Sequence, residues 1–138
     1  MTTKTTTVTG SFTFSRWDEK PVADTDGGAR IAHAAVTNDF TGAVEATGTS
    51  CEYTLVYADE TTGAFVGYEL IEGTLDGRRG SFVLEQRGSF GADGTISCEL
   101  TVLPGSGAGE LAGLSGTGSF TTGHGASTVP YTLTYAIG

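Results

Sequence analysis

Hydrophobic residues recur at every second position along most of this chain, which is the spacing of a strand with one buried face. In the clearest run, residues 128–137, the side chains of Tyr131, Leu133, Tyr135 and Ile137 alternate with Thr and Ala. Clusters of Gly, Asp and Thr separate the runs at intervals typical of all-β domains. The pattern therefore predicts about eight strands and no helix longer than a turn or two.

The first predicted strand carries Val8, Phe12 and Phe14 on one face and ends near Trp17, because Lys20-Pro21 interrupts a strand pattern. The segment 91–94, Gly-Ala-Asp-Gly, predicts a hairpin loop. Run 65–72 is apolar on both faces apart from Glu69, which favours a strand covered on two sides. The other predicted strands are 29–37, 40–42, 45–58 with a bend at Gly48, 80–90, 96–102, 117–122 and 128–137.

A meander of about eight strands must protect its edges, and closure into a barrel removes edges altogether. The expected fold class is therefore all-β, in the form of a closed eight-stranded antiparallel β-barrel or a closely related β-sandwich. The 138 residues match the commonest size of a single domain, so one β-barrel domain is expected over residues 1–138.

Sixteen acidic residues against seven basic ones give a formal charge of −9, which disfavours nucleic acid as a partner. The first residues contain no apolar segment of the kind found in signal peptides, and no run is long enough to span a bilayer. These features predict a cytoplasmic protein without a membrane partner. Cys51 and Cys98 are interpreted as buried thiols rather than a disulfide.

Segment 107–112 formally matches a relaxed dinucleotide-binding pattern, but Gly113, Gly116 and Gly118 would break the helix that such a site needs. A structural loop is the expectation there. The common hydrolase, phosphate-loop and metal-ligand motifs are missing from the sequence. His33 and His124, the only two histidines, are read as hydrogen-bonded or solvated side chains. We therefore expect no cofactor and no metal ion.

Glu69 is the main candidate for chemistry, because it places a carboxylate inside an otherwise apolar strand. Burial would raise its pKa or demand a partner. As a functional residue, it would be a general acid or base, or a ligand anchor, in the interior of the barrel. As a structural residue, it would pair with an Arg or a Tyr and fix the barrel. The alternation of the strand does not decide whether Glu69 points inward.

Further side chains could supply ligand contacts in the same interior. Trp17, at a strand end, could plug one mouth of the barrel or stack on a ligand. Tyrosines in alternating rows are more often packing residues with a bonded hydroxyl, and Gln86 is also an ordinary barrel residue. The candidate ligand-binding residues are Trp17, Tyr53, Tyr57, Gln86 and Tyr135.

Segments 12–21, 65–83 and 105–114 resemble the bacterial family called domain of unknown function 3224, and the likeness extends over nearly the whole chain. Its most specific parts are Tyr68-Glu69 with residues 73–84, and the pattern Ser-Gly-x-Gly-Glu-Leu-Ala-Gly-Leu at 106–114. The resemblance implies an eight-stranded barrel similar to allene oxide cyclase and, more distantly, to plant dirigent proteins. Glu69 and Glu110 match the family, whereas Gln86 and Val129 stand where its members frequently have histidine.

Barrels of this type, where their function is known, bind a small molecule and guide its cyclisation or coupling. The first hypothesis is therefore a cofactor-free cyclase or isomerase that acts on a hydrophobic intermediate through Glu69. The alternatives are a lipocalin-like protein that binds a small apolar ligand without converting it, and a structural or regulatory oligomer. A homodimer is expected if Glu69 faces inward, because Val66, Tyr68 and Leu70 would then need cover outside. A cavity lined by Glu69 would favour the first two hypotheses.

Overall fold

The computed structural model describes residues 4–123 and 125–138, so His124 lies outside the described residues. These residues form one antiparallel sheet of ten strands and contain no helix, and thus no helix that could cross a membrane. The all-β prediction is confirmed. The strands are β1 Thr6–Asp24, β2 Arg30–Gly42, β3 Val44–Glu45, β4 Ser50–Tyr57, β5 Gly63–Leu75, β6 Arg78–Phe90, β7 Thr95–Val102, β8 Ala108–Gly109, β9 Leu114–Gly123 and β10 Val129–Ile137.

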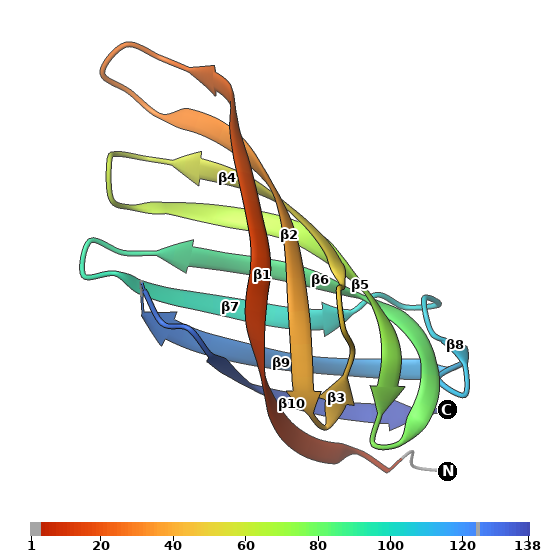
Figure 1. Cartoon of the computed structure of the whole chain (residues 1–138). Helices are drawn as coiled ribbons and strands as arrows, with labels where there is room; N and C mark the ends of the chain where they lie inside the picture. Colours follow the sequence, from red (N-terminus) through yellow and green to blue (C-terminus); the bar gives the residue numbers. More distant parts are fainter. Residues whose placement is uncertain (1–3, 124) are drawn as a thin grey trace.

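The strand order in the sheet is β3-β5-β4-β2-β1-β10-β9-β7-β6-β8, with an additional pairing between β5 and β6. The predicted number of eight strands is too low, because β3 and β8, which have two residues each, were not anticipated. Each of the other eight strands pairs with two long neighbours. Figure 1 shows these strands curving around a shared inner side.

Strand β1 continues beyond Trp17 to Asp24, so the predicted end of the first strand is wrong. Its pairing with β2 extends to Asp24, whereas its pairing with β10 stops at Phe12. In the described part of the chain, no strand pairs with the other edge of β1 beyond Phe12. Pro21 is tolerated because it lies in this edge segment, beside a register shift.

A β-bulge at Ser15 changes which side chains of β1 face inward. Phe14 lies opposite Asn38, but Arg16 lies opposite Thr37, so Ser15 is an extra residue. Trp17, opposite the buried Val36, therefore points to the same inner side as Phe14. Without the bulge, the period of two would send Trp17 outward.

Several other strand boundaries also differ from the predictions. Strand β2 is continuous through Asn38, where a break was expected. Run 45–58 is divided into β3 and β4, because Gly48 has a φ of 68° and the Thr49 amide donates to the Asn38 carbonyl at 2.9 Å. Strand β5 is not covered on both sides as predicted, since Tyr68 is 51% exposed on its outer face.

Two apolar clusters fill the inner side of the sheet. The larger, here called the main core, includes Phe40, Ile71 and Phe82. The smaller cluster includes Val36, Tyr53 and Leu55, with Tyr57, Phe65 and Phe90 packed against it. Along β2, the buried Asn38 separates Val36 of the smaller cluster from Phe40 of the main core. The four buried polar or charged residues form a polar layer at this boundary: Asn38, Thr49, Glu69 and Gln86.

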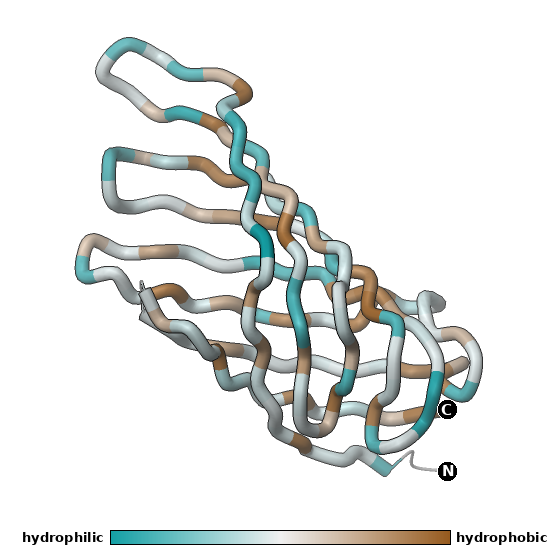
Figure 2. Tube along the Cα trace, in the orientation of Figure 1, coloured by the Kyte–Doolittle hydropathy of each residue, from teal (hydrophilic) through white to brown (hydrophobic). Residues whose placement is uncertain are grey.

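The two ends of the sheet differ in their connections. The hairpins β1–β2, β4–β5 and β6–β7 gather at the loop end, whereas β8 and both termini lie at the opposite, β8 end (Figure 1). Hydrophilic residues occupy the hairpin tips (Figure 2). At the β8 end, Leu111 is fully buried, and Glu110 donates its backbone amide to the Arg79 carbonyl at 2.9 Å. Segment 107–112 contains β8 and turn residues, and no helix follows it.

Candidate functional site

Glu69 points into the inner side of the sheet and is 1% exposed. Its Oε2 accepts hydrogen bonds from Asn38 Nδ2 at 2.8 Å and from Thr49 Oγ1 at 2.6 Å. Its Oε1 accepts one from Gln86 Nε2 at 2.6 Å. The polar layer thus receives one side chain each from β2, β5, β6 and the residue before β4. The question that the sequence left open is answered, because the carboxylate faces inward.

The carboxylate of Glu69 has hydrogen-bond donors but no cation among its contacts in the described residues. Burial raises its pKa, and the hydrogen bonds from Thr49, Asn38 and Gln86 oppose that rise. The structural interpretation from the sequence, which paired Glu69 with an Arg or a Tyr, is wrong about the partners. A buried carboxyl whose pKa is raised is chemically suited to proton transfer.

The polar layer continues to Tyr53 through Gln86. The Tyr53 hydroxyl donates to Gln86 Oε1 at 2.6 Å, and the other end of the same amide donates to Glu69. Burial raises the pKa of Tyr53 well above its usual value, and it raises the pKa of the nearby Cys98 thiol to about 12. Both groups therefore stay protonated at neutral pH. Cys51 and Cys98 are free and buried, as predicted.

Aromatic rings extend from Tyr53 toward solvent on the same inner side. Ring centroids of Phe14 and Trp17 lie 6.2 Å apart, those of Trp17 and Tyr53 6.1 Å apart, and those of Tyr53 and Phe65 5.2 Å apart. Tyr57 and Phe90 form a neighbouring pair at 5.2 Å. We call these residues the aromatic face: Phe14, Trp17, Tyr53, Phe65, Tyr57 and Phe90.

Glycines on adjacent strands make room for these rings. A Cβ atom on Gly67 would lie 2.7 Å from Tyr53 Cδ1, and one on Gly88 would collide with the Phe65 ring. The sequence therefore places aromatic residues where the neighbouring strand has no side chain. This arrangement packs the inner members of the aromatic face firmly against the sheet.

The outer members of the aromatic face are open to solvent. Phe14 is 53% exposed and Trp17 is 45% exposed, although both point to the inner side. The cause is the edge of β1, because β10 covers this strand only as far as Phe12. Large apolar groups on an inner face are normally covered, so this exposure marks a surface at which an apolar molecule could bind.

A carboxylate joins the aromatic face near the loop end. Glu19 Oε1 accepts from Trp17 Nε1 at 3.1 Å, and Glu19 Oε2 accepts from the Tyr57 hydroxyl at 2.6 Å. Partial burial and the hydrogen bond to Glu19 together raise the pKa of Tyr57 to about 12. The same Tyr57 ring is covered by the Arg30 guanidinium, which lies 4.0 Å from the ring centroid.

The structure brings most of the predicted site residues into one connected group. Glu69, Gln86 and Tyr53 are hydrogen-bonded in series, Trp17 packs against Tyr53, and Tyr57 is linked to Trp17 through Glu19. The sixth predicted residue, Tyr135, lies apart from this group. It belongs to the main core, and its hydroxyl donates to Asp76 next to the β8 end.

Three residues of this group were not singled out by the sequence. Asn38 breaks the apolar row Ala32, Ala34, Val36, and this break was a usable signal. Thr49 and Glu19 gave no such signal, because a Thr in a turn and a Glu near a strand end are ordinary surface residues.

Two hollows lie on the outer side of the sheet, and Glu69 lines neither. One, of about 280 Å³, crosses β6, β7 and β9 and is lined mainly by exposed residues such as Arg87 and Ser119. The other, of about 440 Å³, crosses β2, β4 and β5 and includes Tyr68 and Leu70, each 51% exposed. The cavity lined by Glu69 that would favour a binding or catalytic lumen is therefore not one of these two.

The residues that the structure describes contain no group of three or more His, Cys, Asp or Glu side chains that could hold a metal ion. His33, half-exposed on the outer side, has its Nε2 atom 3.7 Å from Glu52 Oε1. The side chains of the connected group are two carboxyls, those of Glu69 and Glu19, together with two amides, hydroxyls and aromatic rings.

Comparison with known proteins gives a family but no activity. A family model described as a protein of unknown function (DUF3224) matches residues 8–135. The chain is similar to a crystal structure from the DUF3224 family, a protein with unknown function from Shewanella oneidensis MR-1. Their identity is 30% and the TM-score 0.76, with 98% of this chain and 99% of that chain covered. A search of curated proteins finds no match.

Proposed function

Because the chain belongs to the DUF3224 family, whose function is unknown, we propose from its own site that it binds a small hydrophobic molecule at the aromatic face. The observation that carries this proposal is the half-exposed pair Phe14 and Trp17 on the inner side of the sheet. Their rings continue inward to Tyr53, whose hydroxyl leads to the polar layer. An apolar molecule at this surface would meet rings first and hydrogen-bonding groups beyond them.

We also propose that the eight long strands act as a closed barrel of the allene oxide cyclase type. The pairing of β5 with β6 supports this proposal, because these are the outermost long strands at the two ends of the strand order. In such a barrel, the opening of the wall beside β1 would give access to the aromatic face.

The single tryptophan makes binding straightforward to test. N-phenyl-1-naphthylamine is neutral and apolar, and it accepts energy from an excited indole. We expect its emission to rise to saturation through energy transfer from Trp17. Phe14→Ala should weaken binding, whereas Leu70→Ala should not. This control is matched, because the two side chains are exposed to similar extents, 53% and 51%, on opposite sides of the sheet.

If the probe does not bind, or binds equally to both variants, the proposed site is wrong. A failure to bind would favour the remaining hypothesis of a structural or regulatory protein. Native mass spectrometry of the purified protein would add an independent test, because a copurified ligand appears there as an additional mass.

A second candidate function is a cofactor-free cyclase or isomerase, and the uncompensated carboxyl of Glu69 favours it. Such an enzyme holds its substrate in one conformer and moves a proton, and a buried carboxyl whose pKa is raised is suited to that transfer. Glu69→Gln should abolish turnover of a candidate substrate while the protein still folds. Glu72→Gln, an exposed position on the same strand, is the control. Unchanged turnover in Glu69→Gln would exclude Glu69 as the catalytic group.

A homodimer stays a prediction. Glu69 faces inward, so Tyr68 and Leu70 stand on the outer face, as that prediction required. The hollow beside them is lined by Arg16 and by Glu52, and a two-fold axis could bring each guanidinium to the carboxylate of the second copy. Sedimentation velocity should give a dimer that Leu70→Lys converts to a monomer. A monomeric wild-type protein would contradict this.

A further inference from the structure

We propose that the ligand of the aromatic face is an organic cation, an apolar molecule with an ammonium group, and that equally apolar carboxylates are rejected. This inference rests on the proposed binding function and specifies its ligand class. Three independent features of the loop end support it: a cation already on a ring, an unpaired carboxylate between rings, and an excess of acidic groups.

The first feature is an internal example of the proposed interaction. The Arg30 guanidinium lies 4.0 Å from the centroid of the Tyr57 ring. The face of an aromatic ring is negative, so it attracts cations and repels anions. The neighbouring rings of Trp17 and Phe14 are about half exposed and have no cation over them in the described residues. A ligand ammonium could take the place there that Arg30 takes on Tyr57.

The second feature is the carboxylate of Glu19. It accepts hydrogen bonds from Trp17 Nε1 and from the Tyr57 hydroxyl, so it is fixed between two rings of the aromatic face. The ion pairs among the described residues involve Asp18, Glu52 and Glu85, and none involves Glu19. A ligand ammonium beside Trp17 would supply the counter-charge that Glu19 lacks, whereas a ligand carboxylate would face a like charge.

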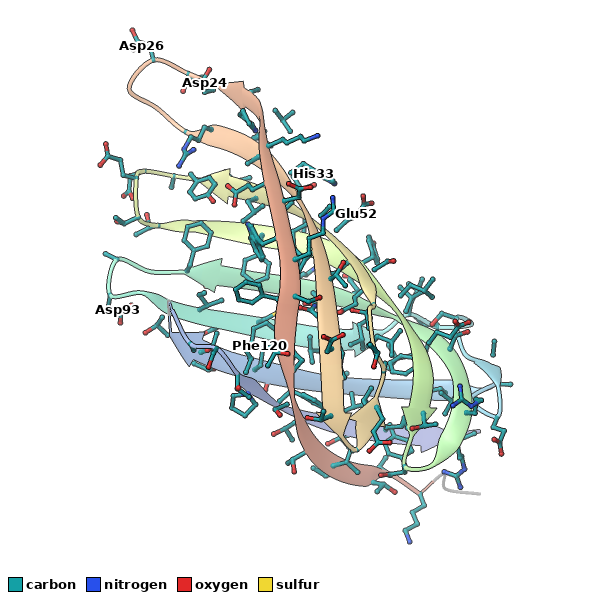
Figure 3. All side chains as sticks on the ribbon, in the orientation of Figure 1. Asp24, Asp26, His33, Glu52, Asp93 and Phe120 are labelled. Carbon is teal, nitrogen blue, oxygen red and sulfur yellow. The ribbon has the colours of Figure 1, made fainter. Side chains whose placement is uncertain are left out.

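The third feature is the charge of the loop end. The three hairpins there carry five carboxylates and one guanidinium, those of Asp24, Asp26, Asp59, Glu60, Asp93 and Arg30. Figure 3 labels Asp24, Asp26 and Asp93 at the hairpin tips. Backbone amides of Thr61 and Thr95 lower the pKa values of Asp59 and Asp93, respectively, so both are charged at neutral pH. The field at the entrance to the aromatic face therefore attracts cations.

The β8 end shows that this charge is local rather than a property of the whole surface. There, three carboxylates are accompanied by two guanidinium groups, those of Glu45, Asp76, Glu110, Arg78 and Arg79. The excess of acidic groups is thus concentrated at the end that holds the exposed rings.

The polar layer beneath the rings contains a hydrogen-bond acceptor without a donor. Asn38 is 2% exposed, and its Oδ1 atom has no hydrogen-bond partner. The Glu69 carboxylate has no cation among its contacts. An ammonium group has three donors to offer to such a layer, whereas a carboxylate would add only acceptors.

The test compares three probes of ten carbons each: decylammonium, decan-1-ol and decanoate. The two ionic probes are titrated below their critical micelle concentrations, and decan-1-ol below its solubility limit, into the whole protein, with Trp17 fluorescence as the readout. We expect the ammonium to bind most tightly and the carboxylate least, with the two separated by about tenfold or more at low salt. Added salt should reduce that ratio, because the charges at the loop end are exposed.

Two matched variants locate the effect. Glu19→Gln should reduce the preference for the ammonium, whereas Glu72→Gln removes the same charge from the outer face of β5 and should not. Thermal unfolding measures whether both variants fold. The salt series tests the inference on the wild-type protein alone, so it does not depend on the folding of a variant. Decanoate binding as tightly as the ammonium would overturn the inference and leave the proposed function intact. If none of the three probes binds, the proposed function fails as well.

Discussion

The main core and the aromatic face lie on the same inner side of the same sheet, but they differ in how far they are covered. Phe82 in the main core is 1% exposed, whereas Phe14 in the aromatic face is 53% exposed. Both are phenylalanines that point inward. The difference comes from strand pairing, because β10 covers β1 only as far as Phe12. The end of one pairing, rather than a change of residue type, thus turns core surface into a candidate binding surface.

The polar layer lies between these two regions and belongs fully to neither. Its carboxylate is as buried as the main core, yet it is connected through Gln86 and Tyr53 to the aromatic face. Burial of a carboxyl without a cation costs stability that an apolar side chain would not cost. The proposed binding function would explain this cost, because the layer is hydrogen-bonded to Tyr53 of the aromatic face.

The largest expected effect separates the two regions by stability. Phe82→Ala should lower the free energy of unfolding by about 3 to 5 kcal/mol, because it leaves a cavity in the main core. Phe14→Ala should lower it by less than about 1 kcal/mol, because the ring is half exposed. Urea denaturation of the two variants measures both values. Similar losses would mean that the aromatic face contributes to stability like the main core.

An intermediate effect is expected from the pH dependence of the polar layer. Burial raises the pKa of Glu69, so the folded protein holds this proton more strongly than the unfolded chain does. The resulting contribution to stability is fully present below the ordinary pKa of a glutamate, about 4.3, and is lost as the pH rises through the raised pKa. Relative to Glu69→Gln, the wild-type protein should therefore lose stability as the pH increases.

Urea denaturation at a series of pH values measures this difference. Glu72→Gln is the control, because it replaces an exposed carboxylate of the same strand and should follow the wild-type profile. A wild-type protein that gains stability over Glu69→Gln with rising pH would show that the hydrogen bonds of the polar layer outweigh its burial.

The smallest effect concerns local opening of β1. Residues 6–12 have paired neighbours on both sides, whereas residues 16–24 have β2 alone among the described strands. Amides in 16–24 should therefore exchange with solvent faster than those in 6–12, because less energy is needed to open an edge segment. Hydrogen exchange followed by NMR resolves both groups. Equal protection would indicate that another chain or segment covers this edge in solution.

The sequence predicts most of the sheet, because alternation and turn residues are local signals. The hairpin at 91–94 and the final strand follow directly from them. The boundary at Trp17 was wrong because Pro21 usually ends a strand, and its tolerance depends on an unpaired edge that only the tertiary structure creates. β3 and β8 were missed because strands of two residues have no alternation to detect.

The candidate site was partly predictable for a related reason. Glu69 and Asn38 are visible as polar residues in apolar rows. Their connection, however, depends on the register between β2, β4, β5 and β6, which one sequence does not fix. Tyr135 resembles Tyr53 in its alternating row, yet the two hydroxyls bond to Asp76 and Gln86 in separate parts of the molecule.

The bulge at Ser15 makes β1 respond differently to lost and to added residues. If Ser15 were deleted, Phe14 and Arg16 would become neighbours and could keep their pairing with Asn38 and Thr37, so Trp17 and Glu19 would still face inward. One inserted residue, by contrast, would put Arg16 opposite the buried Val36 and turn the indole of Trp17 and the carboxylate of Glu19 to the outside. One added codon would thereby dismantle the aromatic face while every residue that forms it was still encoded, whereas one lost codon at position 15 would leave it in place.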